Sequence, residues 1–297
     1  MTQFLNGVHA ISSEAYHASD AISRSNLMDF RRTPYHYWYN KLSGLAETKE
    51  PTPAMILGEL VHTAILEPQE LSNRFWIYPE LDKLPEVGLL KDLGRAEYDR
   101  QKAEREKQSY INKEALAAFE RNSAGKTIIK SEDLKIASLM AESVSNHEIA
   151  QSILKDSKIE QSIFFTHEQT GIQCKARPDI WKGHIVGDLK TTDDASYRGF
   201  QRSAIDYGYF IQAGMMDCAL KSLGLEMNAF VIIAVEKKRP NMVAIYTLDI
   251  QAIDYGIMLF NKLMWGVAEC MEKNEWPGYE TKFLNVPAWA LNDQQEI

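Results

Sequence analysis

The sequence contains few cysteines and no long apolar run, and each absence excludes a class of protein. Its 297 residues include only three cysteines, Cys174, Cys218 and Cys270. Three widely spaced thiols cannot build a disulfide framework, an iron–sulfur cluster or an all-cysteine zinc site, so we expect a reducing compartment. No segment approaches the roughly 18 apolar residues of a membrane span, and the opening MTQFLNGVHAISSE lacks the basic and apolar regions of a signal peptide. We therefore expect a soluble, cytoplasmic protein with no membrane partner.

Net positive charge is also missing. The chain has 33 Lys and Arg against 41 Asp and Glu, a formal net charge of −8. Surfaces that contact phosphates all over are normally basic, which argues against a protein coated with nucleic acid. Carboxylates that hold divalent cations, combined with basic residues confined to a channel, would still be compatible with DNA. A glycine-rich phosphate loop, a G-x-S-x-G elbow and a paired-cysteine motif are all absent, which argues against a small-molecule enzyme.

What is present is the composition of an ordinary globular protein, with 45% hydrophobic and 25% charged residues. No internal repeat, low-complexity stretch or Pro/Gly-rich linker divides the chain. The sequence therefore predicts a single domain over residues 1–297. Its helical part would cover about residues 1–150, and its sheet-bearing catalytic core about residues 151–297.

Helix start signals are clear in the first 70 residues. A helix is predicted over Ser23 to Arg31, and Thr33-Pro34 and Thr52-Pro53 each open another, because Pro at the first helical position lacks only an N–H that would be unpaired there. The third helix, about 53–66, carries His62 one turn after Gly58, where we expect room for a close neighbour. Further helices are predicted over about 91–121 and 131–145.

The helix over about 91–121 alternates in charge. Opposite charges three or four residues apart are typical of a solvated helix face. The alternative is that basic residues of this helix contact the DNA backbone, and the candidates are Arg95, Lys102 and Arg105.

Strand signals begin near residue 160 and predict a mixed α/β plan. We expect strands over Ser162–His167, Ile172–Trp181 and Ile185–Thr191, and then one long helix from about Tyr197 to Ser222. The last elements are predicted as strands over Ala229–Val235 and Val243–Leu248 and a helix over about 250–273.

Two short motifs could carry chemistry. Asp179 lies in Arg177-Pro178-Asp179, and Asp188 and Lys190 lie in Gly187-Asp188-Leu189-Lys190-Thr191. Two carboxylates and an ammonium at one sheet edge suit Mg²⁺, which prefers oxygen ligands, and suit hydrolysis of a phosphodiester. Because D-x-K is common by chance, the alternative is a surface ion pair.

Several longer segments resemble the nuclease domain of exonuclease VIII, the RecE-type recombination exonuclease of the PD-(D/E)XK nuclease superfamily. The similar segments are AISRSNLMDFRRTPYHYW (21–38), LGELVHTAILEP (57–68), CKARPDIW (174–181), IVGDLKTT (185–192), YGYFIQAGMMD (207–217) and WPGYETKFLNVPAWA (276–290). The resemblance covers most of the chain and weakens between about 70 and 155. It implies the PD-(D/E)XK nuclease fold, a central mixed β-sheet flanked by helices, with an N-terminal helical part.

The resemblance also implies roles for individual residues. His62, Asp179 and Asp188 would bind the metal, with the Leu189 carbonyl as a further ligand, and Lys190 would be the catalytic lysine. A histidine on a helix is otherwise more often a structural partner of a carboxylate, and imidazole suits Mn²⁺ better than Mg²⁺, so we expect Mn²⁺ to substitute.

Two further candidate site residues, Gln212 and Glu160, each have a structural alternative. Gln212 matches the glutamine that approaches the nucleophilic water or the DNA in this family, with a polar residue on an amphipathic helix as the alternative. A tyrosine often follows that glutamine by one turn, but here the residue is Met216, which leaves the role vacant or moves it to Tyr207 or Tyr209. Glu160 is a candidate for the metal site, with a solvated turn as the alternative.

The implied activity is a Mg²⁺-dependent exonuclease acting on ends of linear double-stranded DNA. It would degrade one strand from 5′ to 3′ and leave a 3′ single-stranded tail for an annealing protein of the RecT type, in phage or prophage recombination. A homo-oligomeric, tetrameric ring around DNA is expected, in a bacterial or phage-infected cell. The rival interpretations are an endonuclease of the same fold and a non-catalytic DNA-binding module.

Overall fold

The structure, a computed structural model, describes residues 4–47 and 50–286. Within these ranges the chain forms the following elements: β1 (Gly7–His9), α1 (Ser13–Ala18), α2 (Arg24–Arg32), α3 (Pro34–Tyr37), the π-helical turn η1 (Trp38–Leu42), α4 (Pro53–Leu66), the short 3₁₀ turn η2 (Pro68–Glu70), α5 (Leu71–Arg74), β2 (Phe75–Ile77), α6 (Leu90–Leu93), α7 (Arg95–Asn122), β3 (Thr127–Ile129), α8 (Ser131–Ser145), α9 (Glu148–Leu154), β4 (Lys158–Ile159), β5 (Ser162–Thr166), β6 (Gln173–Ala176), β7 (Ile180–Lys182), β8 (Ile185–Thr192), α10 (Tyr197–Asp206), α11 (Tyr209–Ser222), β9 (Ala229–Glu236), β10 (Val243–Leu248) and α12 (Ile250–Lys273). None of the described helices combines the length and the apolar composition that a membrane span requires.

The helices predicted to begin at Ser23, Thr33 and Thr52 do begin there, and each of these residues caps its helix. The side chains of Ser23, Thr33 and Thr52 each accept a hydrogen bond from a backbone N–H in the first turn of α2, α3 and α4. Pro34 and Pro53 occupy the first helical positions, as the Thr-Pro pairs predict. The first 150 residues are not purely helical, however, because β1, β2 and β3 also lie there.

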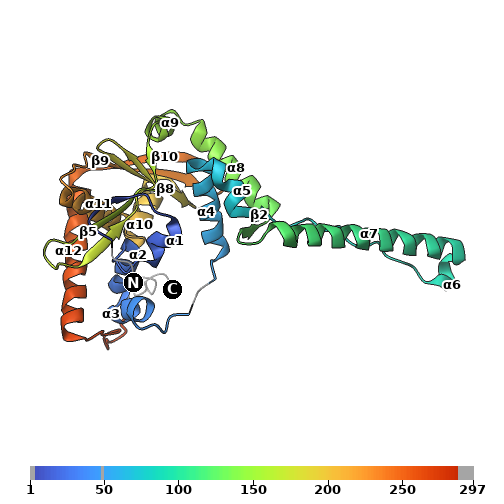
Figure 1. Cartoon of the computed structure of the whole chain (residues 1–297), viewed down its shortest axis with the longest axis horizontal. Helices are drawn as coiled ribbons and strands as arrows, with labels where there is room; N and C mark the ends of the chain where they lie inside the picture. The colour runs from blue at the N-terminus through green and yellow to red at the C-terminus, as the bar shows by residue number, and fades with distance from the viewer. Residues whose placement is uncertain (1–3, 48–49, 287–297) are drawn as a thin grey trace, which may run out of the picture.

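A five-stranded mixed sheet forms the centre of the body, in the order β10-β9-β8-β7-β4. The neighbours β8 and β9 are parallel, and the other pairs are antiparallel. The predicted mixed α/β plan is therefore confirmed (Figure 1). β8, which carries the D-x-K motif, is the middle strand of this sheet.

Helices and a second sheet cover the two faces of the central sheet. On one face, α4 and α8 pack on a core that includes Leu189 and Ile233, and on the other face α11 and α12 pack on Val186 and Ile232. The second sheet, in the order β1-β5-β6, belongs to the α11 side. Alternate residues of β8 therefore point into different cores, which places Asp188 and Lys190 on the α11 side.

The predicted strand Ile172–Trp181 is wrong, because the chain breaks there into β6 and β7. These two strands belong to different sheets, and Cys174 and Ile180, which one continuous strand would place on the same face, lie in separate cores. The break falls at Arg177-Pro178-Asp179. Pro178 lacks a backbone N–H donor and limits the conformation of the residue before it, so the hydrogen bonds of a β-strand cannot continue through this point. The alternation of apolar residues in the sequence continues across it all the same.

The single helix predicted from Tyr197 to Ser222 is also wrong. The structure has two helices, α10 and α11, and Gly208 between them adopts a φ of +69°. That left-handed conformation suits glycine, so the helix stops there and the chain turns.

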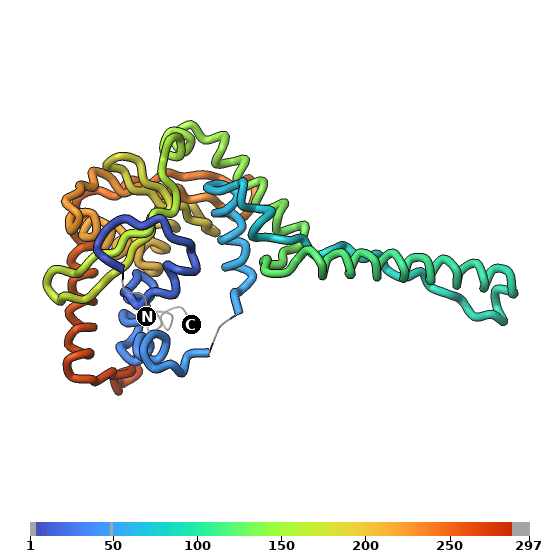
Figure 2. Tube along the Cα trace, viewed as in Figure 1, coloured from blue at the N-terminus to red at the C-terminus, as the bar shows by residue number. Residues whose placement is uncertain are grey.

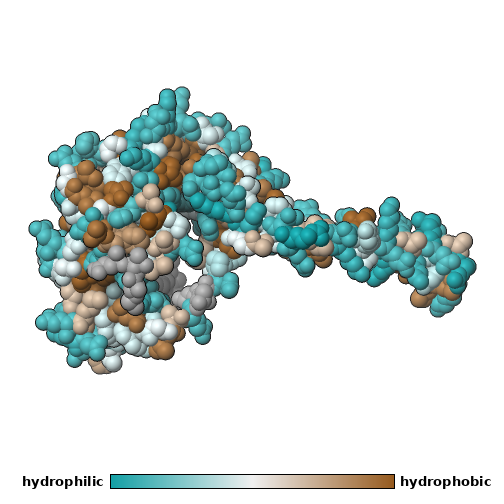
Figure 3. Space-filling view, viewed as in Figure 1, coloured by the Kyte–Doolittle hydropathy of each residue, from teal (hydrophilic) through white to brown (hydrophobic). Residues whose placement is uncertain are grey.

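A long arm projects from the body. It consists of α6 and α7 with the connection before them, and it returns to the body through β3, which pairs with β2 (Figures 1 and 2). No residue of α7 is buried, and the arm is mostly hydrophilic in the view of Figure 3. Arg95 pairs with Asp99 at 2.9 Å, and Lys102 lies 3.9 Å from Glu106, one turn away. These pairs match the expected solvated helix face.

Candidate active site

The site is built where β7 ends beside β8. The two strands pair only as far as Ile180 opposite Gly187, so the next residues of β8 have no strand on this side. The carboxylate of Asp179 takes that place, and its Oδ2 accepts a hydrogen bond from the Leu189 N–H at 2.7 Å. In a strand the N–H and C=O of one residue point to the same side, so the Leu189 carbonyl also faces Asp179.

His62 and Glu160 reach Asp179 from two other elements. His62, on α4, places its Nδ1 3.5 Å from Asp179 Oδ2. Glu160 follows β4, which pairs with β7, and its backbone N–H donates to the Asp179 carbonyl at 3.2 Å. One ligand atom from each of these three residues lies within 4.8 Å of the other two. The structure thus brings together a histidine and two carboxylates from distant parts of the chain.

Asp188 and Lys190 face α11 beside this group. Asp188 is 2% exposed, its Oδ2 contacts the Lys190 ammonium, and its Oδ1 accepts from Gln212 Nε2 at 2.5 Å. The sequence placed Asp188 among the metal ligands. In the structure its carboxylate is held by Lys190 and Gln212, beside the three-residue group.

Negative charge is crowded in this site. Burial, together with the nearby Asp188, raises the pKa of Asp179 above its usual range, although His62 and Lys190 oppose the shift. Burial and the charge of Asp179 raise the pKa of Glu160 to about 7, despite its 2.7 Å ion pair with Arg177. Such shifts mean that burial and the repulsion between the carboxylates outweigh the positive charge that His62, Lys190 and Arg177 supply.

The residues present fit a divalent metal ion. One imidazole nitrogen, the carboxylates and a backbone carbonyl are the donors that Mg²⁺ and Mn²⁺ accept, with the imidazole favouring Mn²⁺. Added positive charge would also relieve the repulsion between the carboxylates. In addition, the Gln212 Oε1 atom is buried and has no hydrogen-bond partner within residues 4–47 and 50–286, which suits a bound water.

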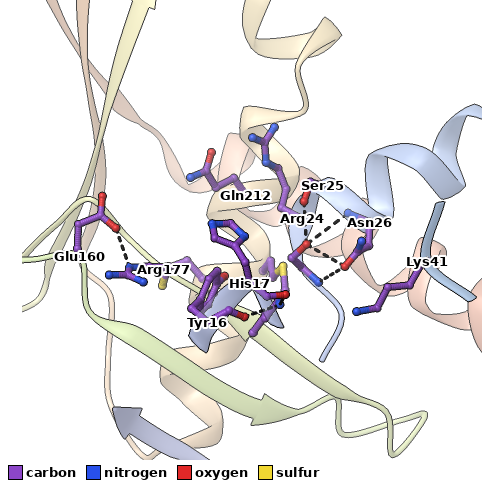
Figure 4. A pocket seen from close by; sticks show the side chains of 14 residues that line it. Tyr16, His17, Arg24, Ser25, Asn26, Lys41, Glu160, Arg177 and Gln212 are labelled. Carbon is purple, nitrogen blue, oxygen red and sulfur yellow. Dashed lines mark hydrogen bonds and ion pairs between the residues drawn. The ribbon is translucent and has the colours of Figure 1, made fainter. Parts of the chain in front are cut away.

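Two cavities open on either side of the Glu160–Arg177 pair, and both residues line both cavities. One cavity, of about 410 Å³, is also lined by Arg24, Lys41 and Gln212, and we call it the basic cavity. Figure 4 shows the Glu160–Arg177 pair at one end of it and Lys41 at the other. The other, of about 920 Å³, lies along α4. It borders Gly58, where, apart from the backbone of α4, no atom of residues 4–47 and 50–286 lies within 4 Å of an added Cβ, so the glycine leaves the room that was expected there.

Sequence reasoning gave one site residue no role, and named another, Tyr209, only as one alternative for the tyrosine that is replaced by Met216. The sequence singled out the Arg177-Pro178-Asp179 motif but gave Arg177 no role of its own. Tyr209 lies under Lys190, with the ammonium 5.0 Å from the ring centroid. Burial, followed by the charge of Asp188, raises the pKa of the Tyr209 hydroxyl to about 12. At the position where the resemblance to the RecE-type exonucleases implies a tyrosine, one turn after Gln212, the chain has Met216, which lines the basic cavity.

Sequence and structure comparisons agree on the class of protein. A sheet whose middle strand carries D-x-K beside a second aspartate defines a PD-(D/E)XK nuclease-like fold. Residues 23–283 match the family described as "PDDEXK-like domain of unknown function (DUF3799)", and the chain belongs to this family. No curated protein sequence matches this chain.

Among solved structures, the chain is similar to one from Eubacterium rectale described as a "Putative exonuclease". The TM-score is 0.57 and the identity is 16%, over 97% of this chain and 100% of that chain. A second structure, described as SSO0001, gives a TM-score of 0.26 at 16% identity, over 46% of this chain and 67% of that chain. The first likeness shows the fold.

Proposed function

We propose that this protein is a metal-dependent exodeoxyribonuclease that degrades linear double-stranded DNA from 5′ to 3′. The observation that carries the proposal is the meeting of His62, Glu160 and Asp179 beside the Asp188–Lys190 pair. These groups come from α4, the end of β4, the break before β7, and β8. A structural ion pair would not need a histidine and two crowded carboxylates whose pKa values are raised, so the crowding supports a cation site.

His62, Glu160, Asp179 and the Leu189 carbonyl would hold Mg²⁺, with Asp188 beside them. A metal ion bound there polarises the phosphodiester and lowers the pKa of a bound water. Gln212 is oriented because its amide nitrogen donates to Asp188 Oδ1, and its free Oε1 would accept a hydrogen bond from the attacking water. Lys190 would then stabilise the negative charge that develops on the phosphate oxygens.

The basic cavity supports a nucleic-acid substrate. Arg24, Lys41 and Arg177 line it together with Ser23 and Ser25, directly beside Gln212. Cations in one cavity can neutralise phosphates near the site even though the whole chain is acidic.

The finer features follow from the resemblance to the RecE-type exonucleases. They are the 5′ to 3′ direction, the 3′ tail, the annealing partner of the RecT type, the role in phage or prophage recombination and the tetrameric ring. A ring is consistent with a net charge of −8, because only its channel would need to be basic.

Digestion of labelled DNA tests the proposal. Linear blunt duplex labelled at either the 5′ or the 3′ end is incubated beside closed circular DNA, in Mg²⁺ and in EDTA. We expect rapid release of the 5′ label only, intact circles and no reaction in EDTA. Cutting of the circles would replace the proposal by an endonuclease, and binding without any metal-dependent cutting would replace it by a DNA-binding module.

A further inference from the structure

A stack of aromatic rings runs from the site to the surface. Tyr209 lies under the Lys190 ammonium, and the ring of Tyr207 is stacked on Tyr209 with centroids 6.0 Å apart and planes 25° apart. Tyr209 also packs on Phe200, which is stacked on Tyr246 at 4.9 Å. Tyr207 is the outer member of the stack and is 61% exposed.

The position of Tyr207 is fixed by the turn between α10 and α11. Its carbonyl accepts from Arg24 Nη1 at 2.5 Å, and the carbonyl of Ile205 accepts from Arg31 Nη1 at 3.0 Å. Gly208 follows in a left-handed conformation, with Met28 against it. Two arginines of α2 therefore hold the end of α10, so an exposed aromatic ring is presented on a rigid support.

The cavity beside Tyr207 differs in charge from the basic one. It has a volume of about 230 Å³ and is lined by hydroxyl groups and two aspartates, among them Thr191, Ser203, Asp193 and Asp194. Asp193 lies 3.5 Å from Lys237. The carboxylates repel a phosphate, while carboxylates and hydroxyls can both accept hydrogen bonds from the amino groups of a base.

Stacking on an aromatic ring is how proteins hold unpaired bases without reading their sequence. We infer that Tyr207 is a stacking platform for a nucleobase of the strand that is being cut, with the base edge over the Thr191–Ser203 cavity. The inference rests on the proposed function, because it assigns the base of the same substrate whose phosphates face Arg24 and Arg177. Lys237 also lines this cavity and would contact the following phosphate.

Removal of single bases from the substrate tests the platform. The set of proteins is wild type, Tyr207→Phe, Tyr207→Ala and the control Tyr197→Ala. Tyr197 is the first residue of α10, the helix that Tyr207 caps, and is 70% exposed, but it lines a different cavity. The DNA is a linear duplex, either intact or with an abasic nucleotide at one of the first three positions of the degraded strand. Binding is followed by fluorescence anisotropy in EDTA, and single-turnover cleavage in Mg²⁺.

In wild type, Tyr207→Phe and Tyr197→Ala, we expect one abasic position to weaken binding about 5- to 100-fold. Tyr207→Ala should bind intact DNA more weakly by a similar factor and show no further loss with abasic DNA. The inference is overturned if the abasic penalty in Tyr207→Ala equals that of wild type. It is also overturned if Tyr207→Ala binds intact DNA as tightly as Tyr197→Ala.

The two proposals fail in different ways. Loss of the proposed function would appear as DNA that is never cut in Mg²⁺, while base-dependent binding in EDTA could still depend on Tyr207. Failure of the platform would appear as normal Mg²⁺-dependent cutting whose abasic penalty does not depend on Tyr207.

Discussion

At the scale of single residues, one carboxylate connects the structure to the chemistry. Asp179 replaces the missing strand beside β8 by accepting the Leu189 N–H, and it lies against His62 and Glu160 at the same time. A group that continues a backbone ladder is held more rigidly than a free side chain. The geometry of the proposed metal site is thus set by the strand break itself, as preorganisation of the proposed catalytic site requires.

Replacement of Lys190 should slow catalysis and leave the fold intact. In Lys190→Ala we expect cleavage of linear DNA in Mg²⁺ to fall about 10²- to 10⁴-fold, because a charge that stabilises the reacting phosphate is lost. The control is Lys182→Ala, since Lys182, on β7, donates to the Ser152 carbonyl at 2.7 Å and does not belong to the candidate site. Steady-state cleavage rates of both variants measure the loss of activity, and their circular dichroism spectra check that the fold is intact. A Lys190→Ala protein as active as Lys182→Ala would remove Lys190 from the mechanism.

Lys175 should make the free energy of unfolding depend on pH in the alkaline range. Its ammonium is buried and donates to the carbonyls of Tyr16 and Ser19 at 2.7 and 3.0 Å. Burial, and then the charge of Lys41, lowers the pKa of Lys175 to about 8. Between pH 8 and about 10.5 the unfolded chain therefore binds more protons than the folded one, so the free energy of unfolding contributed by Lys175 rises with pH.

Chemical denaturation of wild type and Lys175→Met from pH 7 to 10 measures this effect. We expect Lys175→Met to be less stable at every pH, because buried carbonyls lose their donor. Its stability should also lack the rise that Lys175 gives to wild type. Equal pH slopes in the two proteins would show that the pKa of Lys175 is not lowered by folding.

At the scale of elements, the contact between α11 and α12 depends on two glycines. A Cβ on Gly214 would meet the backbone of Gly256, and a Cβ on Gly256 would meet the Phe210 carbonyl oxygen. Backbone atoms cannot move aside as side chains do, so this close approach fixes α11. Because α11 carries Gln212 and Tyr209, the helix contact positions part of the active site.

Alanine at these glycines should be destabilising, although alanine favours a helix. For Gly214→Ala and Gly256→Ala we expect a loss of about 2 kcal/mol or more, from overpacking. The control is Gly58→Ala on α4, where no atom lies within 4 Å of the added Cβ, and where we expect a gain of about 0.5–1 kcal/mol. Thermal and denaturant unfolding compare the three. A Gly214→Ala protein as stable as Gly58→Ala would contradict the close helix contact.

The sequence predicted those elements whose signals are local. The caps of α2 and α4 are such signals, because the hydroxyls of Ser23 and Thr52, and Pro53 in α4, act within the first turn of their own helix. The break between β6 and β7 was missed because the apolar alternation continues across it while the strands enter different sheets. The resemblance suggested His62 and Glu160 for the metal site, but the Glu160–Arg177 pair and the ring of Tyr209 depend on tertiary packing.

At the scale of the whole molecule, the arm is separate from the body that carries the site. Asp82 and Asn112 face each other across its base, where the Asn112 amide donates to the Asp82 carbonyl at 2.8 Å. Beyond that pair α7 buries no side chain, and its ion pairs are the kind that contribute little to stability. The arm should therefore be dispensable for folding of the body.

Deletion of the arm tests this separation. Residues 83–111 are replaced by about four Gly and Ser residues, enough to join Asp82 to Asn112. We expect the melting temperature of the body to change by no more than about 4 °C, and the helical circular dichroism signal to fall by the share of α6 and of the part of α7 that is removed. A shortened protein that fails to fold would show that the arm supports the body.

The most direct measurement compares wild type with Asp188→Asn on linear double-stranded DNA, in Mg²⁺, in Mn²⁺ and in EDTA. Asn keeps the shape of Asp188 and the contact with Gln212 but removes the charge that faces Lys190. We expect wild type to release nucleotides only in Mg²⁺, and Asp188→Asn to be slower by about 10³-fold or more with its circular dichroism unchanged. Full activity in Asp188→Asn, or no hydrolysis by wild type in either Mg²⁺ or Mn²⁺, would contradict a nuclease centre at this site.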